Sequence, residues 1–538
     1  MNRLLCLALA GVLAGAPASG AVAERAAPKT FTEALRAVMA RPEFKHASFG
    51  VEIYSLDTQA PVFALNPDAL FTPGSTTKLL TEGTALKLLG ADYRFHTPVY
   101  RTGEIGPDGV LNGDLVLVAS GDPNLSNREQ ADGTLAFADE DHTYGGVESR
   151  LIPGDPLAVI RGLAKQIAAA GVKRVAGRVL VDVSLFPEGE RELGTGVVIS
   201  PIAVNDNVVD LTFRPGPTLG APLDITVSPQ VPYLRFENRT RTVAGTKLTF
   251  EGGETVDNPD GSQTVTLDGS MGQASGPAIY GYPVSSPSRY AGTVLTLALK
   301  DLGVAVAGAP ATVKDGAATA AWRQPRYRVA EHVSAPLTEE VKVTLKVSHN
   351  LHASMTPFIV GALVGKAAKA IDAKGFALEN AMLTKAGLDL TGASQSDGAG
   401  GASAAFYSPD FMVRYLAFMA AQPEFAAFKR ALPILGRDGT LVNIQRDAPG
   451  AGHVFAKTGT YTGMDLLNAR PMLIGKGLAG YTTTPSGKRY AIALYVNHVE
   501  LRDERPLTEL AGQALGEIAS AAYALPIDRP TLETASGR

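Results

Sequence analysis

The sequence predicts an α/β fold in which one unit, built from both ends of the chain, is interrupted by a long insert rich in strands. Three observations predict it. Of the 538 residues 45% are hydrophobic, which is enough for a sizeable core. The 57 glycines and 35 prolines supply more turn formers than a helix-only bundle uses. Helical and strand-like spacing alternates near both ends, whereas turn signals crowd residues 96–325.

Residues 1–23 have the pattern of a secretory signal peptide. Arg3 precedes an apolar run over residues 4–15, and Ala21 and Ala23 form a small-x-small cleavage site. The run falls short of the roughly 20 residues that span a bilayer, although an uncleaved anchor is the alternative. The single cysteine, Cys6, lies in this segment. We therefore expect a thiol-free mature chain in the bacterial periplasm, cleaved near Ala23 and without a transmembrane anchor.

The N-terminal elements follow from hydrophobic spacing. Residues 31–39 have helical spacing, and the alternating segments 49–54 and 62–65 predict two strands joined by a turn. A Thr-Pro-Gly break at 72–74 then precedes a helix over 75–89.

The rest of the chain divides into the insert and a return to helical spacing. Within the insert, two helical patches are predicted near residues 156–170 and 290–302. Beyond it, helices are predicted at 337–345, 352–363, 409–419 and 507–523, and strands at 454–460 and 489–496. The predicted units are therefore 24–95 together with 326–538, interrupted by 96–325.

Ser75 and Lys78 open the predicted helix 75–89 as Ser-Thr-Thr-Lys. Residues three apart share a helix face, so the lysine can reach the serine hydroxyl. That hydroxyl needs a base to become a nucleophile, and a lysine can serve when burial or a second cation lowers its pKa. Free N–H groups at the helix start can also stabilise an oxyanion. The alternative is a capping serine followed by a solvated lysine.

Two further short motifs carry polar groups suited to acyl transfer. Ser348 and Asn350 lie between helical stretches, where the hydroxyl could pass a proton and the amide could hold a lysine and a substrate carbonyl. Lys457 begins Lys-Thr-Gly-Thr, in which Gly459 lets a substrate backbone approach a strand. The alternatives are an ordinary turn and an exposed edge-strand lysine.

The three motifs occur in the order Ser-x-x-Lys, Ser-x-Asn, Lys-Thr-Gly, which is the combination of β-lactamases and penicillin-binding proteins. With segments 89–97, 121–125, 204–207, 396–398 and 436–440, the chain resembles the bacterial D-alanyl-D-alanine carboxypeptidase/endopeptidase family over nearly all of its length after residue 23. These are low-molecular-mass penicillin-binding proteins with large inserted domains. The resemblance implies a transpeptidase-like domain of the serine β-lactamase/penicillin-binding-protein type, with helices on both faces of an antiparallel sheet, interrupted by a β-rich insert.

The resemblance also implies a two-step acyl transfer without cofactor or metal. Its catalytic residues are Ser75, Lys78, Ser348, Asn350 and Lys457. Its substrate-binding residues are Thr458, Gly459 and Thr460. The expected substrates are peptidoglycan peptides with D-Ala–D-Ala termini or D-alanyl cross-links, and β-lactams are expected to acylate the enzyme.

The sequence departs from the family pattern in two places. His349 stands where the family usually has aspartate, and residues 399–401 read Ala-Gly-Gly where a serine usually follows Asp-Gly. Because histidine is neutral or weakly cationic near pH 7, we expect changes in substrate preference and pH optimum rather than in the basic chemistry.

Other functions have less support. A net charge of −4 argues against a protein that grips nucleic acid. His349-x-x-His352 lacks the glutamate of a zinc peptidase helix. Two alternatives stay open: a β-lactamase or esterase that uses the same serine, and a non-catalytic peptidoglycan-binding protein.

Overall fold

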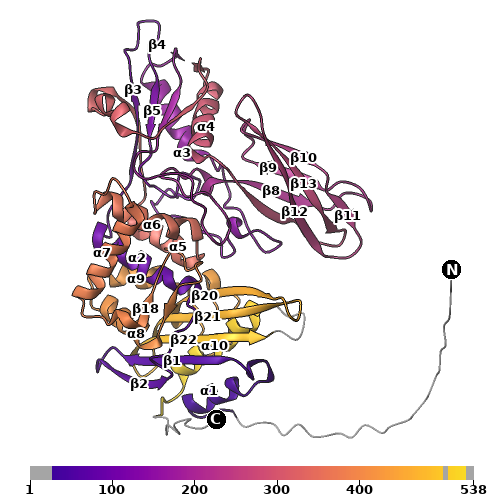
Figure 1. Ribbon diagram of the computed structural model, residues 1–538, viewed down its shortest axis with the longest axis vertical. Coiled ribbons are helices and arrows are strands. Elements are labelled where there is room, and N and C mark those ends of the chain that lie inside the picture. The colour runs from indigo at the N-terminus through magenta and orange to yellow at the C-terminus, as the bar shows by residue number, and fades with distance from the viewer. Residues whose placement is uncertain (1–26, 501–506, 529–538) are drawn as a thin grey trace, which may run out of the picture.

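The computed structural model describes residues 27–500 and 507–528, so the predicted signal peptide lies outside the described residues. A five-stranded antiparallel sheet of order β2-β1-β22-β21-β20 organises the lower part of the molecule (Figure 1). Its strands are β1 (Ser48–Ser55), β2 (Ala60–Leu65), β20 (Val454–Asp465), β21 (Arg470–Thr483) and β22 (Arg489–Glu500). β1 pairs directly with β22, so this sheet joins the two ends of the chain.

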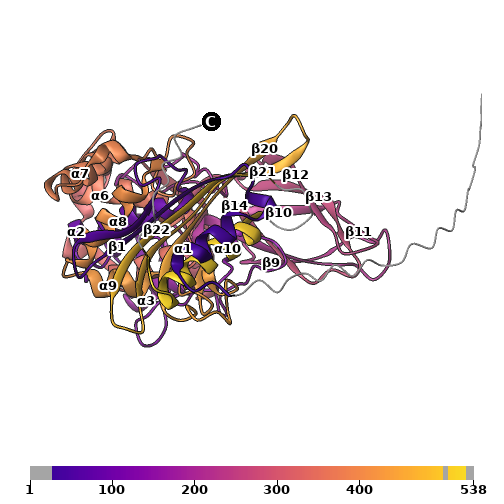
Figure 2. The ribbon, with the colours of Figure 1, turned by 90° about the horizontal axis from the view of Figure 1, so that it is seen from below.

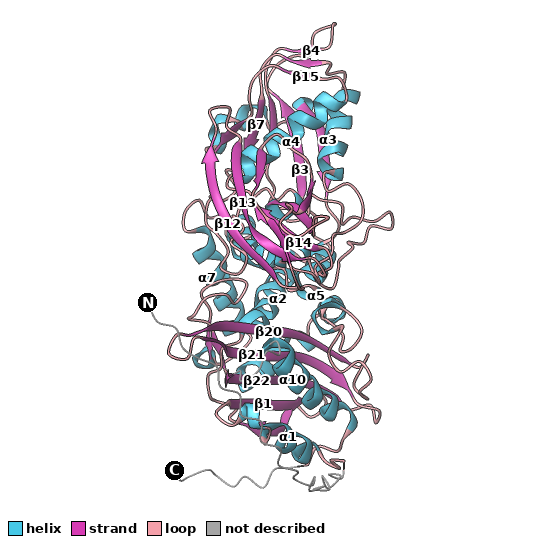
Figure 3. Cartoon of the chain, turned by 90° about the vertical axis from the view of Figure 1, so that its right-hand side faces the viewer, coloured by secondary structure: helices cyan, strands magenta, loops and turns pink. Residues whose placement is uncertain are grey.

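Helices cover both faces of this sheet (Figures 2 and 3). α1 (Phe31–Met39) and α10 (Leu507–Ala524) pack on one face, where Ile492 and Leu494 of β22 point. α2 (Lys78–Leu89) and α8 (Pro409–Ala420) pack on the other, where the alternate residues Ala491 and Ala493 point. The predicted antiparallel sheet with helices on both faces is therefore confirmed.

Further helices pack against α2, against α8 and against one another on this side of the sheet. They are α5 (Leu337–Lys346), α6 (Asn350–Leu363), α7 (Ile371–Lys385) and α9 (Phe425–Ala431). α7 and α9 were not predicted. The buried positions of α7 include Gly375 and Glu379, so its sequence has no apolar stripe to reveal the helix.

Residues between α2 and α5 form the upper part of Figure 1. This region contains several further sheets, of which the largest also has five strands, in the order β16-β7-β5-β3-β17. The predicted helical patches are confirmed as α3 (Ala158–Ala169) and α4 (Pro287–Asp301). The strands of this region are β3 (His96–Arg101), β4 (Val110–Leu111), β5 (Leu115–Val118), β6 (Arg174–Val175), β7 (Val179–Asp182), β8 (Val208–Arg214), β9 (Asp224–Ser228), β10 (Leu234–Asn238), β11 (Arg241–Val243), β12 (Leu248–Asp257), β13 (Gln263–Gly272), β14 (Ala278–Pro283), β15 (Ala305–Val306), β16 (Ala311–Val313) and β17 (Arg328–Val333).

A short pair, β18 (Ala393–Ser394) and β19 (Phe406–Tyr407), completes the strands that the structure describes. Among the helices of the described ranges, none is both long and apolar enough to cross a membrane. The division of the chain into domains at residues 95 and 325 stays a prediction.

Candidate active site

Ser75 and Lys78 meet where a short 3-10 turn continues into a helix. The predicted helix over 75–89 is in fact the 3-10 turn η2 (Gly74–Thr77) followed by α2. The Lys78 Nζ donates to the Ser75 Oγ at 2.8 Å, to the Asn350 Oδ1 at 2.8 Å and to the Ala399 carbonyl at 2.9 Å. The ammonium group thus uses all three of its N–H bonds on fixed acceptors, one of which is the serine hydroxyl.

Ser348 and Lys457 form a second hydrogen-bonded pair beside the first. The Lys457 Nζ donates to the Ser348 Oγ at 2.8 Å and to the Thr458 carbonyl at 2.9 Å. Ser348 lies in the link between α5 and α6 with a φ of +64°, a left-handed conformation that non-glycine residues adopt rarely. The Tyr144 hydroxyl donates to its carbonyl oxygen, which helps to hold this conformation.

The edge strand β20 packs directly against the turn that carries Ser75. A Cβ added at Gly459 would lie 1.9 Å from the Pro73 carbonyl oxygen, and one added at Gly74 would lie 2.4 Å from the Thr460 backbone nitrogen. Only glycines allow backbones this close. The contact brings the Thr460 backbone nitrogen next to the turn that begins at Gly74.

Burial dominates the charge state of both lysines. Lys78 has no exposed surface, and burial lowers its pKa to about 7, although Asp397, Glu192 and Glu82 act in the opposite direction. Burial and the neighbouring ammonium groups of Lys78 and Lys476 hold the pKa of Lys457 well below its ordinary value. An amine with a pKa near neutrality can accept a proton from a hydroxyl, as a general base must.

All predicted site residues converge, namely Ser75, Lys78, Ser348, Asn350, Lys457, Thr458, Gly459 and Thr460. Within this group the Thr458 Oγ1 hydrogen-bonds the Thr440 Oγ1 at 2.8 Å.

The predicted site residues do not include several others that touch the site. Asp397 accepts N–H groups from residues 399–402 and so orients the Ala399 carbonyl that Lys78 uses. The departure to alanine at 399 is compatible with this role, because the contact is made by the backbone.

The loop before Val197 also closes on the site. A Cβ added at Gly194 would lie 2.1 Å from the Asn350 Nδ2. The Glu192 carboxylate holds this loop by accepting the Gly194 N–H at 2.7 Å and the Thr195 N–H. No motif in the sequence marks these residues, because they lie about 150 positions before Asn350 and reach it only in the fold.

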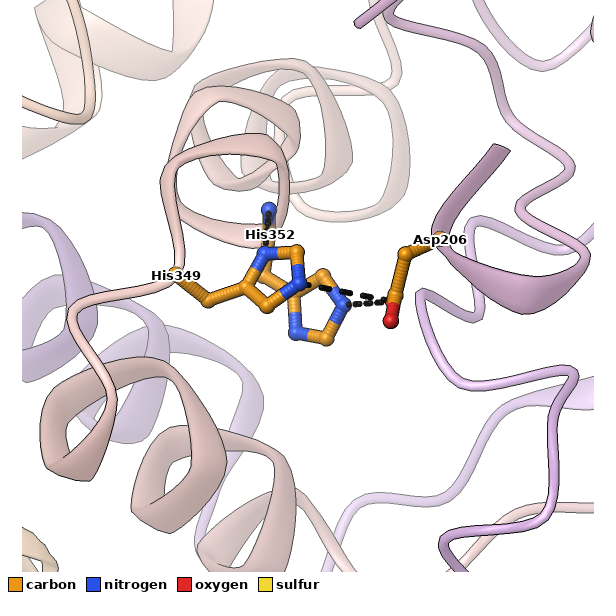
Figure 4. Close-up of side chains that lie close together, drawn as sticks. All are labelled: Asp206, His349 and His352. Atoms are coloured by element: carbon orange, nitrogen blue, oxygen red, sulfur yellow. Dashed lines mark hydrogen bonds and ion pairs between the residues drawn. The ribbon is translucent and has the colours of Figure 1, made fainter. Parts of the chain in front are cut away.

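The His349 side chain points into a buried group of charged side chains around Asp206. Its ring stacks on that of His352 with centroids 3.6 Å apart, and both rings direct a nitrogen toward Asp206 (Figure 4). The His352 Nε2 lies 2.8 Å and the His349 Nε2 3.5 Å from the Asp206 Oδ1. The other Asp206 oxygen accepts from the Arg128 guanidinium at 2.9 Å, and Arg128 also donates to Asp141 at 2.7 Å.

Two overlapping sets of side chains in the described part of the chain bring potential metal donors within 4.8 Å of one another. They are Asp206, His349 and His352, and Asp141, His142 and Asp206. The His349 Nδ1 accepts the His352 backbone N–H at 3.4 Å as the cap of α6, so the proton of a neutral ring lies on Nε2. Arg128 already pairs with both carboxylates. This chemistry fits an ionic hydrogen-bond network better than a metal centre.

Comparison with known proteins places the chain in a family. The model of the D-Ala-D-Ala carboxypeptidase 3 (S13) family matches residues 31–513. A D-alanyl-D-alanine carboxypeptidase of an Actinomadura species is 27% identical over 498 residues, which cover 88% of this chain and 82% of the relative. A D-alanyl-D-alanine carboxypeptidase of Haemophilus influenzae is 22% identical over 457 residues, which cover 83% and 84% of the two chains.

The same fold is found among solved structures. Penicillin binding protein 4 of Haemophilus influenzae matches with a TM-score of 0.69 at 19% identity, covering 91% of this chain and 98% of that one. A second structure of that protein, complexed with a β-lactam, matches with a TM-score of 0.67. The arrangement of the sheet, its helices and the strand-rich upper region is thus one that is known from experiment.

Proposed function

Because the chain belongs to the D-Ala-D-Ala carboxypeptidase 3 (S13) family, we propose that it is a serine peptidase acting through an acyl-enzyme on Ser75. Its substrates are the D-Ala–D-Ala termini of peptidoglycan peptides, their D-alanyl cross-links, or both. β-Lactams acylate the same serine.

In the first step the Ser75 Oγ attacks the carbonyl carbon of the penultimate D-alanine. Lys78 takes the hydroxyl proton as a free amine, for which its lowered pKa is suited. The backbone N–H groups of Ser75 and Thr460 stabilise the oxyanion, and the close packing of Gly74 on Thr460 supports this pairing. Asn350 holds Lys78 and the substrate in register.

The terminal D-alanine, which is the leaving group, departs beside Ser348 and Lys457. Ser348 protonates the nitrogen of the terminal D-alanine and recovers a proton from Lys457, to which it is hydrogen-bonded. The hydroxyls of Thr458 and Thr460, beside Lys457, bind the terminal carboxylate. Gly459 contributes by letting β20 pack against the turn of Ser75, so that the substrate lies between them. Water then hydrolyses the acyl-enzyme and restores Ser75.

One observation carries the proposal: two separate lysines, each with a lowered pKa, are each hydrogen-bonded to a serine hydroxyl at 2.8 Å. A serine or lysine with a purely structural role does not need such a pairing. A nucleophile needs a base beside it, and a proton donor needs a group that returns its proton, so a catalytic role accounts for both serine–lysine pairs. The proposal includes export to the periplasm, which rests on the pattern of residues 1–23.

The test is intact mass spectrometry after brief exposure to benzylpenicillin, with Ser75→Ala alongside. We expect the wild-type protein to gain the mass of one penicillin and the variant to gain none. Release of D-alanine from a D-Ala–D-Ala peptide should also vanish in the variant.

Each other outcome favours a different function. Labelling of Ser75→Ala would overturn the assignment of the nucleophile. Rapid hydrolysis of the drug without a lasting adduct would indicate a β-lactamase. Binding of peptidoglycan without an adduct and without D-alanine release would indicate a non-catalytic wall-binding protein.

A further inference from the structure

A third lysine approaches the site from the far side of the sheet. Lys476 of β21 lies directly opposite Thr460 of β20 in the antiparallel register. Its Nζ donates to the Thr460 Oγ1 at 2.7 Å. The side chain runs along the face covered by α10, where Gly512 is its neighbour, and reaches the hydroxyl beneath the edge strand.

Lys476 is a buried cation without an anionic partner. Its side chain is 7% exposed, and no carboxylate in the described part of the chain lies within ion-pair distance of its Nζ. The other deeply buried lysine outside the motifs, Lys346, has such a partner in Asp438 at 2.6 Å. A buried ammonium with one neutral acceptor is costly, so an unpaired one needs an explanation.

The surroundings of Lys476 are positively charged. Lys78, Lys457 and Lys476 lie close enough for each to influence the next, and the repulsion lowers the pKa of Lys457. Burial lowers the pKa of Lys476 itself to about 8, so at neutral pH it keeps its proton. The positive groups meet at the Thr458–Thr460 edge of β20, where an incoming anion would be attracted.

We propose that Lys476 is a positioning residue which orients the Thr460 hydroxyl toward the terminal carboxylate of the substrate and adds to the positive charge of Lys457 beside this carboxylate. The inference rests on the proposed peptidase function and adds a specificity determinant to it. The substrate carboxylate is then the missing partner of the buried ammonium. Ligands without a free carboxylate gain nothing from Lys476.

The experiment compares two ligands that differ only in the carboxylate: benzylpenicillin and its methyl ester. The second-order rate constant of Ser75 acylation is measured for each with the wild type, Lys476→Met, Lys476→Gln and Lys476→Arg. In the methionine and glutamine variants we expect the benzylpenicillin constant to fall about 10- to 100-fold, as for a lost charge-assisted hydrogen bond, while the ester constant changes little. The arginine variant should keep most of the preference for the free acid.

Lys429→Met is the matched control. Lys429 in α9 lies 4.7 Å from the centre of the Phe455 ring of β20, and its loss should leave both constants unchanged. Equal falls for acid and ester would show a merely structural role and overturn the proposal. Unchanged constants in all Lys476 variants would overturn it as well. An unreactive wild-type protein would overturn the proposed function, and the role of Lys476 with it.

Discussion

At the scale of single residues, the proposed mechanism makes the reaction of Ser75 depend on the charge state of the Lys78 amine. Because burial lowers its pKa to about 7, the neutral amine becomes the major form as the pH rises through that value. We expect the rate constant of penicillin acylation to rise with pH through about 7 and then level off. Measurements from pH 5.5 to 8.5 on the wild type would check this, within the range where the protein stays folded.

A permanently charged side chain at position 78 should abolish the pH dependence of acylation. Lys78→Arg can donate hydrogen bonds but cannot serve as a base, so we expect acylation to slow by about 10²- to 10⁴-fold. Binding of a substrate peptide before acylation should weaken far less. A collapse of binding with an unchanged acylation rate would instead make Lys78 a binding group.

The residues of the site differ in how far the sequence alone can predict them. Ser75 and Lys78 are three positions apart, so local geometry is enough to bring them together. Ser348 and Lys457 are 109 positions apart, and only the family resemblance linked them in advance. Lys476 belongs to no motif, and its partner Thr460 follows from the register of β20 and β21, which depends on the whole sheet.

At the scale of elements, the contact between η2 and β20 determines where the Thr460 N–H lies relative to Ser75, and these are the two residues that we propose as oxyanion donors. Gly459→Ala would force a methyl group against the Pro73 carbonyl oxygen, which belongs to the backbone and cannot turn aside. The turn and the strand would separate and the Thr460 N–H would move. We expect penicillin acylation to slow about 10²- to 10³-fold, as when one oxyanion donor is lost.

A glycine further along the same strand provides the control for this substitution. A Cβ at Gly463 would meet the tip of the Ile474 side chain, which can move. Gly463→Ala should therefore leave the acylation rate near that of the wild type. If both variants slowed equally, a general effect of alanine on β20 would be responsible.

At the scale of the whole molecule, a buried ionic network ties the upper region to the helix that follows Ser348. Arg128, Asp141 and Asp206 come from the upper region, and His349 and His352 belong to the start of α6. Burial alone would raise the pKa of Asp206, but Arg128 and His349 hold it well below its ordinary value. The network therefore stabilises the fold above the pKa of an unfolded aspartate, about 3.9, and is lost as the pH falls through the lower folded value.

Removal of the arginine tests this link. Arg128→Met removes the guanidinium that bridges two buried carboxylates and leaves them only histidine and neutral partners, so we expect the free energy of unfolding at pH 7 to fall by about 3–5 kcal/mol in urea denaturation. The loss should shrink in acid as the carboxylates become protonated. Arg235→Met, which removes an exposed pair with Asp260, should change stability little.

The sequence indicated the sheet and most helices around the site, but not this network. The strand pattern of residues 49–54 and 489–496 is local, and it is confirmed in β1 and β22. The side chain of His349, by contrast, faces Asp206, which lies far upstream and reaches it only when the upper region packs on α6. The consequence of this histidine for substrate preference stays a prediction.

The pairing of β1 with β22 has a consequence for the order of events during synthesis. A ribosome releases Ser75 and Lys78 early, yet β1 must wait for residues 489–500 before its edge is covered. Lys457 and Thr460 also arrive late, on a strand that needs β21 and β22 beside it. Under the proposed mechanism, a nascent or prematurely terminated chain consequently carries Ser75 without the Thr460 N–H and without Lys457, and we expect that β-lactams do not acylate it. The proposed activity therefore requires the last strands of the sheet.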